Sequence, residues 1–206
     1  VWVGGDSSIA SLNVEQFGIW GTRNVSSASF YPGARARSVN WKDADGNFWL
    51  MGGQGFDASG NNGLLNDLWK YNVSTKEWTW VSGSKSINQT GVYGTRGVAN
   101  SANIPGARYG AVGWTDASGN LWLMGGQGYT TTTTSGYLND LWKFDPLSGQ
   151  WTWISGTNTV NSNGSYGSRG VASGTSLPPA RWASVAWTDA NGKFWLMGGS
   201  NGSRFN

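Results

Sequence analysis

The chain has 206 residues and a mass of 22.0 kDa, enough for one large domain or two small ones. Its 14 Lys and Arg against 11 Asp and Glu leave a formal charge of +3, too small an excess to indicate nucleic-acid binding. Because there is no Cys and no His, the sequence excludes disulfides, zinc fingers and catalytic triads built on these side chains. No apolar stretch approaches the roughly 18 residues of a membrane span.

A repeat of 73 residues runs through the chain. The triplet Met-Gly-Gly begins at Met51, Met124 and Met197, and the motifs LNDLWK and WTW recur at the same spacing. Such a long exact period indicates an architecture built from repeated structural units.

Each repeat is predicted to form four short antiparallel strands. In the second repeat, two β-rich runs flank the turn sequence DASGN, which is the pattern of a β-hairpin. Two consecutive glycines are expected to end the second strand, and the turn sequence DPLSG separates the third strand from the fourth. Apolar residues show no helical period, so we expect an all-β fold. The predicted strands of this repeat are 109–114, 121–124, 141–144 and 151–155.

Several residue markers fall at the same places in the repeats. A double glycine closes strand two, an aromatic residue and a Trp flank the turn between strands three and four, and an Arg begins strand one. They are Gly52, Gly53, Gly125, Gly126, Gly198 and Gly199; Tyr71 with Trp78 and Phe144 with Trp151; and Arg35, Arg108 and Arg181. Together they resemble the kelch repeat, in the variety found in bacterial secreted proteins of the galactose-oxidase-like kind. The resemblance implies four-stranded β-propeller blades.

The number of repeats is too small for a closed propeller. The chain holds about 2.8 repeats of 73 residues, whereas closed rings have roughly four to eight blades. It is either an excerpt of a longer propeller or a subunit that joins its copies head to tail. We expect the last strand of a preceding blade at 1–5, whole blades at 32–83 and 105–156, half a blade at 179–199, and inter-blade loops at 6–31, 84–104 and 157–178.

Trp and Arg residues supply the candidate ligand-binding groups. Most Trp residues occupy repeated positions, where packing between blades is the expected role. Trp20 and Trp182 stand where the other repeats have different residues, so they are the candidates for stacking on a sugar ring, although an aromatic residue on a blade face without a ligand is the simpler role. Arg23, Arg96 and Arg169 recur in the long loops. Packing over a blade face is their simpler role, and binding an anionic glycan or carboxylate is the alternative.

Recurring carboxylates fall at two places in the repeat. Those that open the hairpin turns are expected to cap backbone amides. Those that enter strand three are placed to pair with the Arg that begins strand one. One turn, DADGN, resembles a calcium loop only superficially, so no metal site is predicted. The residues are Asp43, Asp116 and Asp189 in the turns, and Asp67 and Asp140 opposite Arg35, Arg108 or Arg181.

The repeats differ most between strands two and three. There the sequence FDASGNNGL is replaced by YTTTTTSGY, and variable loops are where specificity can be located, although a merely solvated loop is the simpler interpretation. The candidate interaction residues are Asp57, Asn61 and Asn62, and Thr130, Thr131, Thr132, Thr133 and Thr134. Sequons that permit N-glycosylation lie at Asn24, Asn72, Asn88, Asn163 and Asn201.

No constellation of residues points to catalysis. The copper site of galactose oxidase needs His and a Cys-linked Tyr, which this chain lacks. We therefore expect a non-catalytic interaction or assembly module without a cofactor, secreted or displayed on a cell surface. Its partner is expected to be another protein, other copies of itself or the remainder of a longer propeller. No nucleic-acid partner and no membrane span are expected. Carbohydrate binding through exposed Trp and polar loops is the alternative, and a galactose-oxidase-like enzyme with its catalytic residues outside this chain is a third.

Overall fold

The computed structural model describes residues 17–202, which form strands and loops without a helix. The expected all-β fold is therefore confirmed, and this part of the chain holds no helix that could span a membrane. The segment 1–5, expected to be a strand, lies outside the described residues. The strands are β1 (Ser26–Ser27), β2 (Arg35–Ala36), β3 (Val39–Lys42), β4 (Phe48–Phe56), β5 (Asn62–Asn72), β6 (Glu77–Ser82), β7 (Arg108–Tyr109), β8 (Val112–Thr115), β9 (Leu121–Tyr129), β10 (Ser135–Asp145), β11 (Gln150–Ser155), β12 (Val185–Thr188) and β13 (Phe194–Met197).

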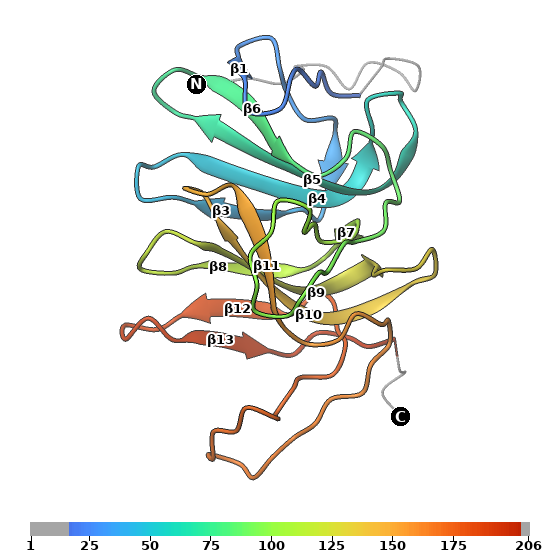
Figure 1. The fold of residues 1–206 in the computed structure, drawn as a ribbon, viewed down its shortest axis with the longest axis vertical. Helices are drawn as coiled ribbons and strands as arrows, with labels where there is room; N and C mark the ends of the chain where they lie inside the picture. The colour runs from blue at the N-terminus through green and yellow to red at the C-terminus, as the bar shows by residue number, and fades with distance from the viewer. Residues whose placement is uncertain (1–16, 203–206) are drawn as a thin grey trace.

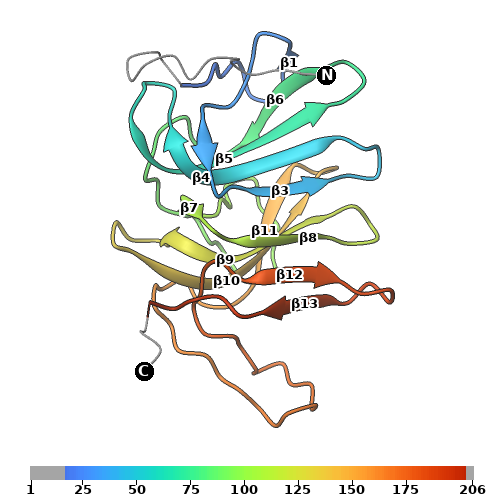
Figure 2. The same cartoon turned by 180° about the vertical axis from the view of Figure 1, so that it is seen from behind.

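The strands form three antiparallel sheets, one for each repeat. The first sheet has the order β1-β6-β5-β4-β2, with β3 also paired to β4, and the second has the order β11-β10-β9-β7, with β8 also paired to β9. The third sheet contains β12 and β13. Figures 1 and 2 show the three sheets lying one beyond another along the long axis of the molecule.

The first turn of each repeat is held by an Asp side chain. In the first repeat, Oδ1 of Asp43 accepts the backbone N–H of Asn47 at 2.8 Å, and Oδ2 accepts the indole N–H of Trp49 at 2.9 Å. Burial raises the pKa of Asp43, but these hydrogen bonds outweigh burial and hold it below its ordinary value. The corresponding indole bonds to Asp116 and Asp189 measure 2.8 and 2.9 Å. The predicted turn role is confirmed.

In the first two repeats the double glycines do not end the second strand, so the prediction is wrong there; in the third repeat β13 does end at Met197, directly before Gly198. β9 continues through Gly125 and Gly126 to Tyr129, and its pairing with β10 changes register beside them. Gly125 has a φ of 66°, and a Cβ there would lie 2.8 Å from the carbonyl oxygen of Arg181 in the next repeat. At Gly125 glycine is therefore needed for a bulge and for the close approach of a neighbouring backbone, and it does not terminate the strand.

The main core lies between the first and second sheets. The indole N–H of Trp41 donates to the carbonyl oxygen of Trp122 at 3.0 Å, and the ring of Trp49 lies 5.8 Å from that of Phe144. Val39 and Met51 complete the contacting face of the first sheet and are buried. Inter-sheet packing, the role predicted for the repeated Trp residues, is confirmed here.

The second and third sheets pack in the same way. The ring of Trp114 stacks on Phe194 at 5.3 Å and 15°, and its indole N–H donates to the carbonyl oxygen of Trp187 at 3.1 Å. Backbone hydrogen bonds also link equivalent positions of successive repeats. The N–H of Gly110 donates to the carbonyl oxygen of Arg37 at 2.9 Å, and the N–H of Ala183 donates to that of Gly110 at 2.8 Å. One mode of stacking thus relates each sheet to the next.

Candidate functional site

The third sheet has an apolar face that no described residue covers, which we call the open face. Val185 pairs with Met197 and Trp187 with Trp195, so these four side chains lie on the same side of the sheet. All four are exposed. Trp195 is 48% exposed, whereas its equivalent Trp49 is 3% exposed because the second sheet covers it. A contiguous exposed apolar face of this kind is a candidate interaction surface.

The same sheet has an unpaired edge. β4 pairs with β3 on one side and β5 on the other, and β9 pairs likewise with β8 and β10. β13 pairs with β12, and no strand within residues 17–202 lies on its other side. Along that edge no strand of the described range pairs with the backbone N–H and C=O groups, which suits the edge to a further strand.

An arginine beside this edge lacks the carboxylate that its equivalents have. Arg35 pairs with Asp67 at 2.6 Å and Arg108 with Asp140 at 2.7 Å, which confirms these two predicted pairs. Arg181, for which the same partner type was expected, faces no carboxylate among the described residues. Its guanidinium donates instead to the carbonyl oxygen of Gly198 at 2.7 Å and to the hydroxyl of Tyr166 at 3.1 Å.

The long loop before the third sheet also lacks a surface to pack on. In the preceding repeat, Tyr93 is 3% exposed; its hydroxyl donates to Asp140 at 2.6 Å and its ring lies 4.7 Å from Trp142. The equivalent Tyr166 is 77% exposed. Figure 1 shows the orange segment between β11 and β12 extending away from the sheets, whereas the green segment between β6 and β7 lies along β10 and β11.

Two of the three loop arginines that were candidate ligand groups are engaged within the fold. Arg23 lies over the ring of Trp80 at 4.8 Å and donates to the carbonyl oxygen of Gly83, and Arg96 does the same with Trp153 at 4.4 Å and Gly156. These contacts support the packing role. Arg169 is exposed and has no such Trp or carbonyl partner within residues 17–202.

The first sheet exposes the opposite kind of face. Phe194 of the third sheet packs on the Trp rings of the second sheet. The equivalent residue of the second sheet, Leu121, is fully buried against the first sheet. At the same position of the first sheet, Phe48 is 51% exposed. The described structure therefore presents, at its two ends, the two surfaces that stack on each other inside it.

The two candidate stacking tryptophans have different environments. Trp20 is buried with its ring 5.4 Å from that of Trp69, so the expectation of an exposed ring is wrong there: the loop folds it onto the first sheet. Trp182 is half-buried, 5.5 Å from the ring of Tyr109. The guanidinium of Arg37 lies 5.2 Å from the Trp182 ring and 5.7 Å from the Tyr109 ring.

The contribution of Arg37 was missed from the sequence. It is exposed, and no ion pair or side-chain hydrogen bond joins it to another residue of the described range. The signal that could have found it is its place in the repeat, where the other copies have Gly110 and Ala183. A charged side chain replaces small ones beside the very residue, Trp182, that also departs from the repeat.

The variable loops are only partly available for binding. Asp57 is buried and accepts the backbone N–H groups of Ser59 and Asn61 at 2.9 Å, which holds its own loop together. Thr130 is buried under Gly91, whose N–H donates to its carbonyl at 2.6 Å. Their assignment as interaction residues is therefore wrong. The exposed members are Asn61, Asn62, Thr131, Thr132, Thr133 and Thr134.

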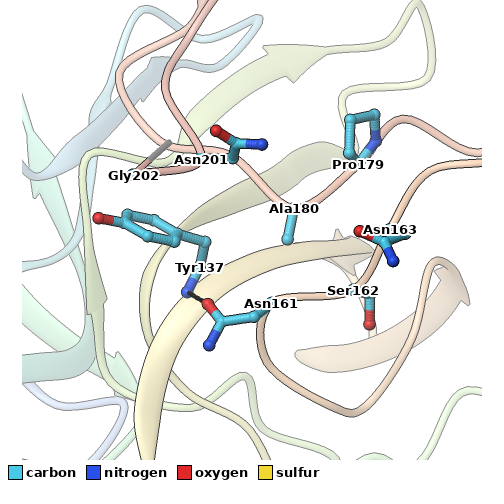
Figure 3. Close-up of a pocket in the computed structure, with 8 residues that line it drawn as sticks. All are labelled: Tyr137, Asn161, Ser162, Asn163, Pro179, Ala180, Asn201 and Gly202. Atoms are coloured by element: carbon cyan, nitrogen blue, oxygen red, sulfur yellow. Dashed lines mark hydrogen bonds between the residues drawn. The ribbon is translucent and has the colours of Figure 1, made fainter. Parts of the chain in front are cut away.

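A polar hollow lies beside the start of β10 (Figure 3). Its lining includes Tyr137, Asn161 and Ser162, and Asn161 accepts the backbone N–H of Tyr137 at 2.9 Å. Asn163 and Asn201 of the sequons also line it and are exposed, as are Asn24 and Asn88. Asn72 is half-buried and caps the turn that follows β5. The hollow is lined by no charged side chain.

Within residues 17–202, no group of three acidic side chains gathers in a way that could hold a metal ion. No protein-family profile and no curated protein matches the chain. Solved structures do resemble it: 105 of their chains match, so the fold is a recurrent one. A structure of YjhT aligns with a TM-score of 0.51 at 16% identity, over 82% of this chain and 45% of that one. The chain thus spans less than half the length of that protein, and the likeness shows the fold alone.

Proposed function

We propose that this chain is a non-catalytic interaction and assembly module built from kelch-type propeller blades, acting outside the cell. The observation that carries the proposal is the open face: Trp187 and Trp195 are exposed in the third sheet, whereas the equivalent residues are buried in the first. Low charge and a surface rich in Ser, Thr and Asn support the extracellular setting.

The chemistry of the open face specifies its partner. Inside the molecule, a face of Val, Trp, Trp and Met always receives a face centred on Phe or Leu, as when Trp114 stacks on Phe194. The first sheet exposes Phe48 at the corresponding place. A second copy, stacked head to tail, would therefore repeat a contact that the fold already makes twice, and such heterologous contacts produce rings or filaments.

Disulfide cross-linking tests this proposal cleanly because the chain has no Cys. Head-to-tail stacking would bring Trp187 of one copy near Phe48 of the next. The double variant Phe48→Cys/Trp187→Cys should give a ladder of cross-linked species under mild oxidation. The matched control Val73→Cys/Trp187→Cys, with an exposed residue in the turn between β5 and β6, should not. Equal cross-linking of both pairs, or none, would reject the stacking.

Carbohydrate binding is the second candidate function, and the cluster of Arg37, Tyr109 and Trp182 favours it. Two half-buried aromatic rings flank a guanidinium that has no acceptor among the described residues. Aromatic faces pack against the apolar face of a sugar ring, and a free guanidinium suits a carboxylate. The cluster therefore fits a sugar acid better than a neutral hexose.

Titration with galacturonate and with galactose, followed by Trp fluorescence, tests this second candidate. We expect galacturonate to bind more tightly, with Trp182→Ala abolishing the response. Trp195→Ala removes an exposed Trp outside the cluster and should leave it unchanged. If neither sugar binds the folded protein, or if both variants behave alike, carbohydrate binding at this cluster is rejected.

A further inference from the structure

We infer that the third sheet is completed by a β-hairpin from outside the 206 residues, and that its first strand carries an Asp followed two residues later by a Trp. This inference rests on the proposed interaction at the third sheet and names the chemistry of the partner. The hairpin would pair with the free edge of β13, as β10 and β11 follow β9. The second repeat is the template, because each side chain that lacks a partner beside the third sheet has an equivalent there whose partner is known.

Arg181 and Tyr166 require the Asp. In the second sheet, Asp140 accepts two bonds from Arg108, at 2.7 Å each, and one from Tyr93 at 2.6 Å. Arg181 and Tyr166 occupy the equivalent positions and bond to each other at 3.1 Å. A carboxylate entering at the β13 edge would accept both donors, and a bidentate pair with Arg is among the stronger polar contacts.

The exposed ring of Tyr166 requires the Trp. Its equivalent Tyr93 is covered by Trp142 of β10 at 4.7 Å and by Trp153 of β11 at 5.2 Å. The indole N–H of Trp142 also donates to Asp140 at 2.8 Å, which couples the Trp to the Asp on one strand. An Asp-Leu-Trp strand therefore meets the needs of Arg181 and Tyr166 together.

Arg169 requires a second strand beyond the first. Arg96 lies over the ring of Trp153 and donates to the carbonyl oxygen of Gly156. Trp153 is in β11 and Gly156 directly follows it, and a tight turn joins β11 to β10. Arg169 keeps the same loop setting, since the bridge between Ser165 and Leu177 repeats that between Val92 and Ile104. The loop around Arg169 keeps the conformation of the earlier loop, but the described residues contain no equivalent of β11 for Arg169 to contact. The partner is therefore a hairpin rather than a single strand.

A second copy of this chain cannot donate such a hairpin from its folded sheets. Its Asp-Leu-Trp segments are in β5 and β10, where Asp67, Trp69, Asp140 and Trp142 are all fully buried. Releasing either strand would dismantle a core. Glycine at 198 leaves room for the incoming strand: a Cβ there meets nothing within 4 Å, whereas at Gly125 it meets the carbonyl of Leu138 in β10 at 3.1 Å.

A synthetic peptide of residues 135–156, which spans β10 and β11, is the probe. We expect it to bind the 206-residue chain and to protect the amides of Phe194–Met197 from hydrogen exchange. The peptide with Asp140→Asn should bind about tenfold more weakly, because it loses a charge-assisted pair with Arg181. Arg181→Gln in the protein should produce the same loss, and Lys76→Gln, which removes a distant exposed charge, should not.

The inference is overturned if the peptide does not bind, if it binds without protecting β13, or if Asp140→Asn binds as tightly as the parent. These failures are separable from failure of the stacking proposal. If the chain forms the cross-linked ladder but does not bind the peptide, the proposed assembly stands and the hairpin is rejected. A chain that takes up the peptide but forms no ladder loses the stacking of copies and keeps the hairpin.

Discussion

At the scale of single residues, each complete repeat is organised by one buried carboxylate. Asp140 accepts bonds from Arg108, Tyr93 and Trp142, and all four side chains are buried. Burial, together with the adjacent Asp140 carboxylate, raises the pKa of Tyr93 above its ordinary value. Removing one partner of a buried ion pair leaves the other as an uncompensated buried charge, so each member is sensitive to truncation.

Asp140→Ala should therefore lower the free energy of unfolding by about 3–5 kcal/mol, because it leaves Arg108 charged and unpaired in the core. Arg181→Ala at the equivalent place should change stability far less, since no carboxylate depends on it in the described structure. Urea unfolding monitored by Trp fluorescence measures both. Equal losses for the two variants would contradict the roles assigned to them.

Stability should depend on pH in the acid range through the turn carboxylates. Burial raises the pKa of Asp57, but the N–H groups of Asn61 and Ser59 lower it more, so its folded value lies below the 3.8 of an unperturbed Asp. Asp43 and Asp116 are also lowered. Their contribution is complete above about pH 5 and is lost as the pH falls through the depressed values.

The urea midpoint should therefore stay level between about pH 5 and 8, where a chain without His has no side chain of ordinary pKa to titrate. Below about pH 4 it should fall steadily. Asp57→Asn should make the acid decline shallower. A midpoint that is constant down to about pH 2, or that changes chiefly near neutrality, would be inconsistent with this account.

At the scale of elements, the bulged second strand is the feature that ties neighbouring sheets together. Gly125 and Gly198 occupy equivalent places with φ values of 66° and 67°, so alanine carries the same backbone strain at both. Only at Gly125 would the new Cβ meet backbone, namely the carbonyl oxygens of Arg181 and Leu138. Comparing alanine variants at Gly125 and Gly198 therefore separates the cost of the steric contact from the cost of the backbone conformation.

Gly125→Ala should accordingly destabilise the protein by about 1–3 kcal/mol more than Gly198→Ala, the usual cost of overpacking. Thermal unfolding measures the difference. In the presence of the bound 135–156 peptide, Gly198→Ala should become costly as well, because the incoming strand would lie where β10 lies beside Gly125. If the two variants unfold alike without peptide, the close approach at Gly125 does not constrain the fold.

The elements themselves could be predicted only as far as local signals reach. The DASGN turn between two β-rich runs specifies a hairpin, and the structure has one there between β8 and β9. β9 runs through its glycines because the long-range pairing of Gln127 and Gly128 with β10 outweighs the local tendency of glycine to break strands. β1 could not be foreseen, since Ser26 and Ser27 pair with β6 and carry no strand propensity.

At the scale of the whole molecule, the repeat allowed part of the candidate site to be predicted and led to a wrong prediction for another part. Equivalent positions predict equivalent roles, and this holds for Arg35 and Arg108. It fails for Trp187 and Trp195, which were assigned to packing, because burial is a property of the neighbouring sheet and not of the residue. Trp20 failed in the opposite sense: a departure from the repeat suggested exposure, but Trp20 still packs on Trp69.

The central claim is that the open face of the third sheet is an association surface, and the native mass measured by light scattering over a range of concentrations tests it most directly. We predict a mass that rises above the 22.0 kDa of the single chain as concentration increases. Met197→Lys, which places a charge on the open face, should return the mass to that of one chain. A wild-type mass of 22.0 kDa at every concentration, unchanged by the substitution, would contradict the account.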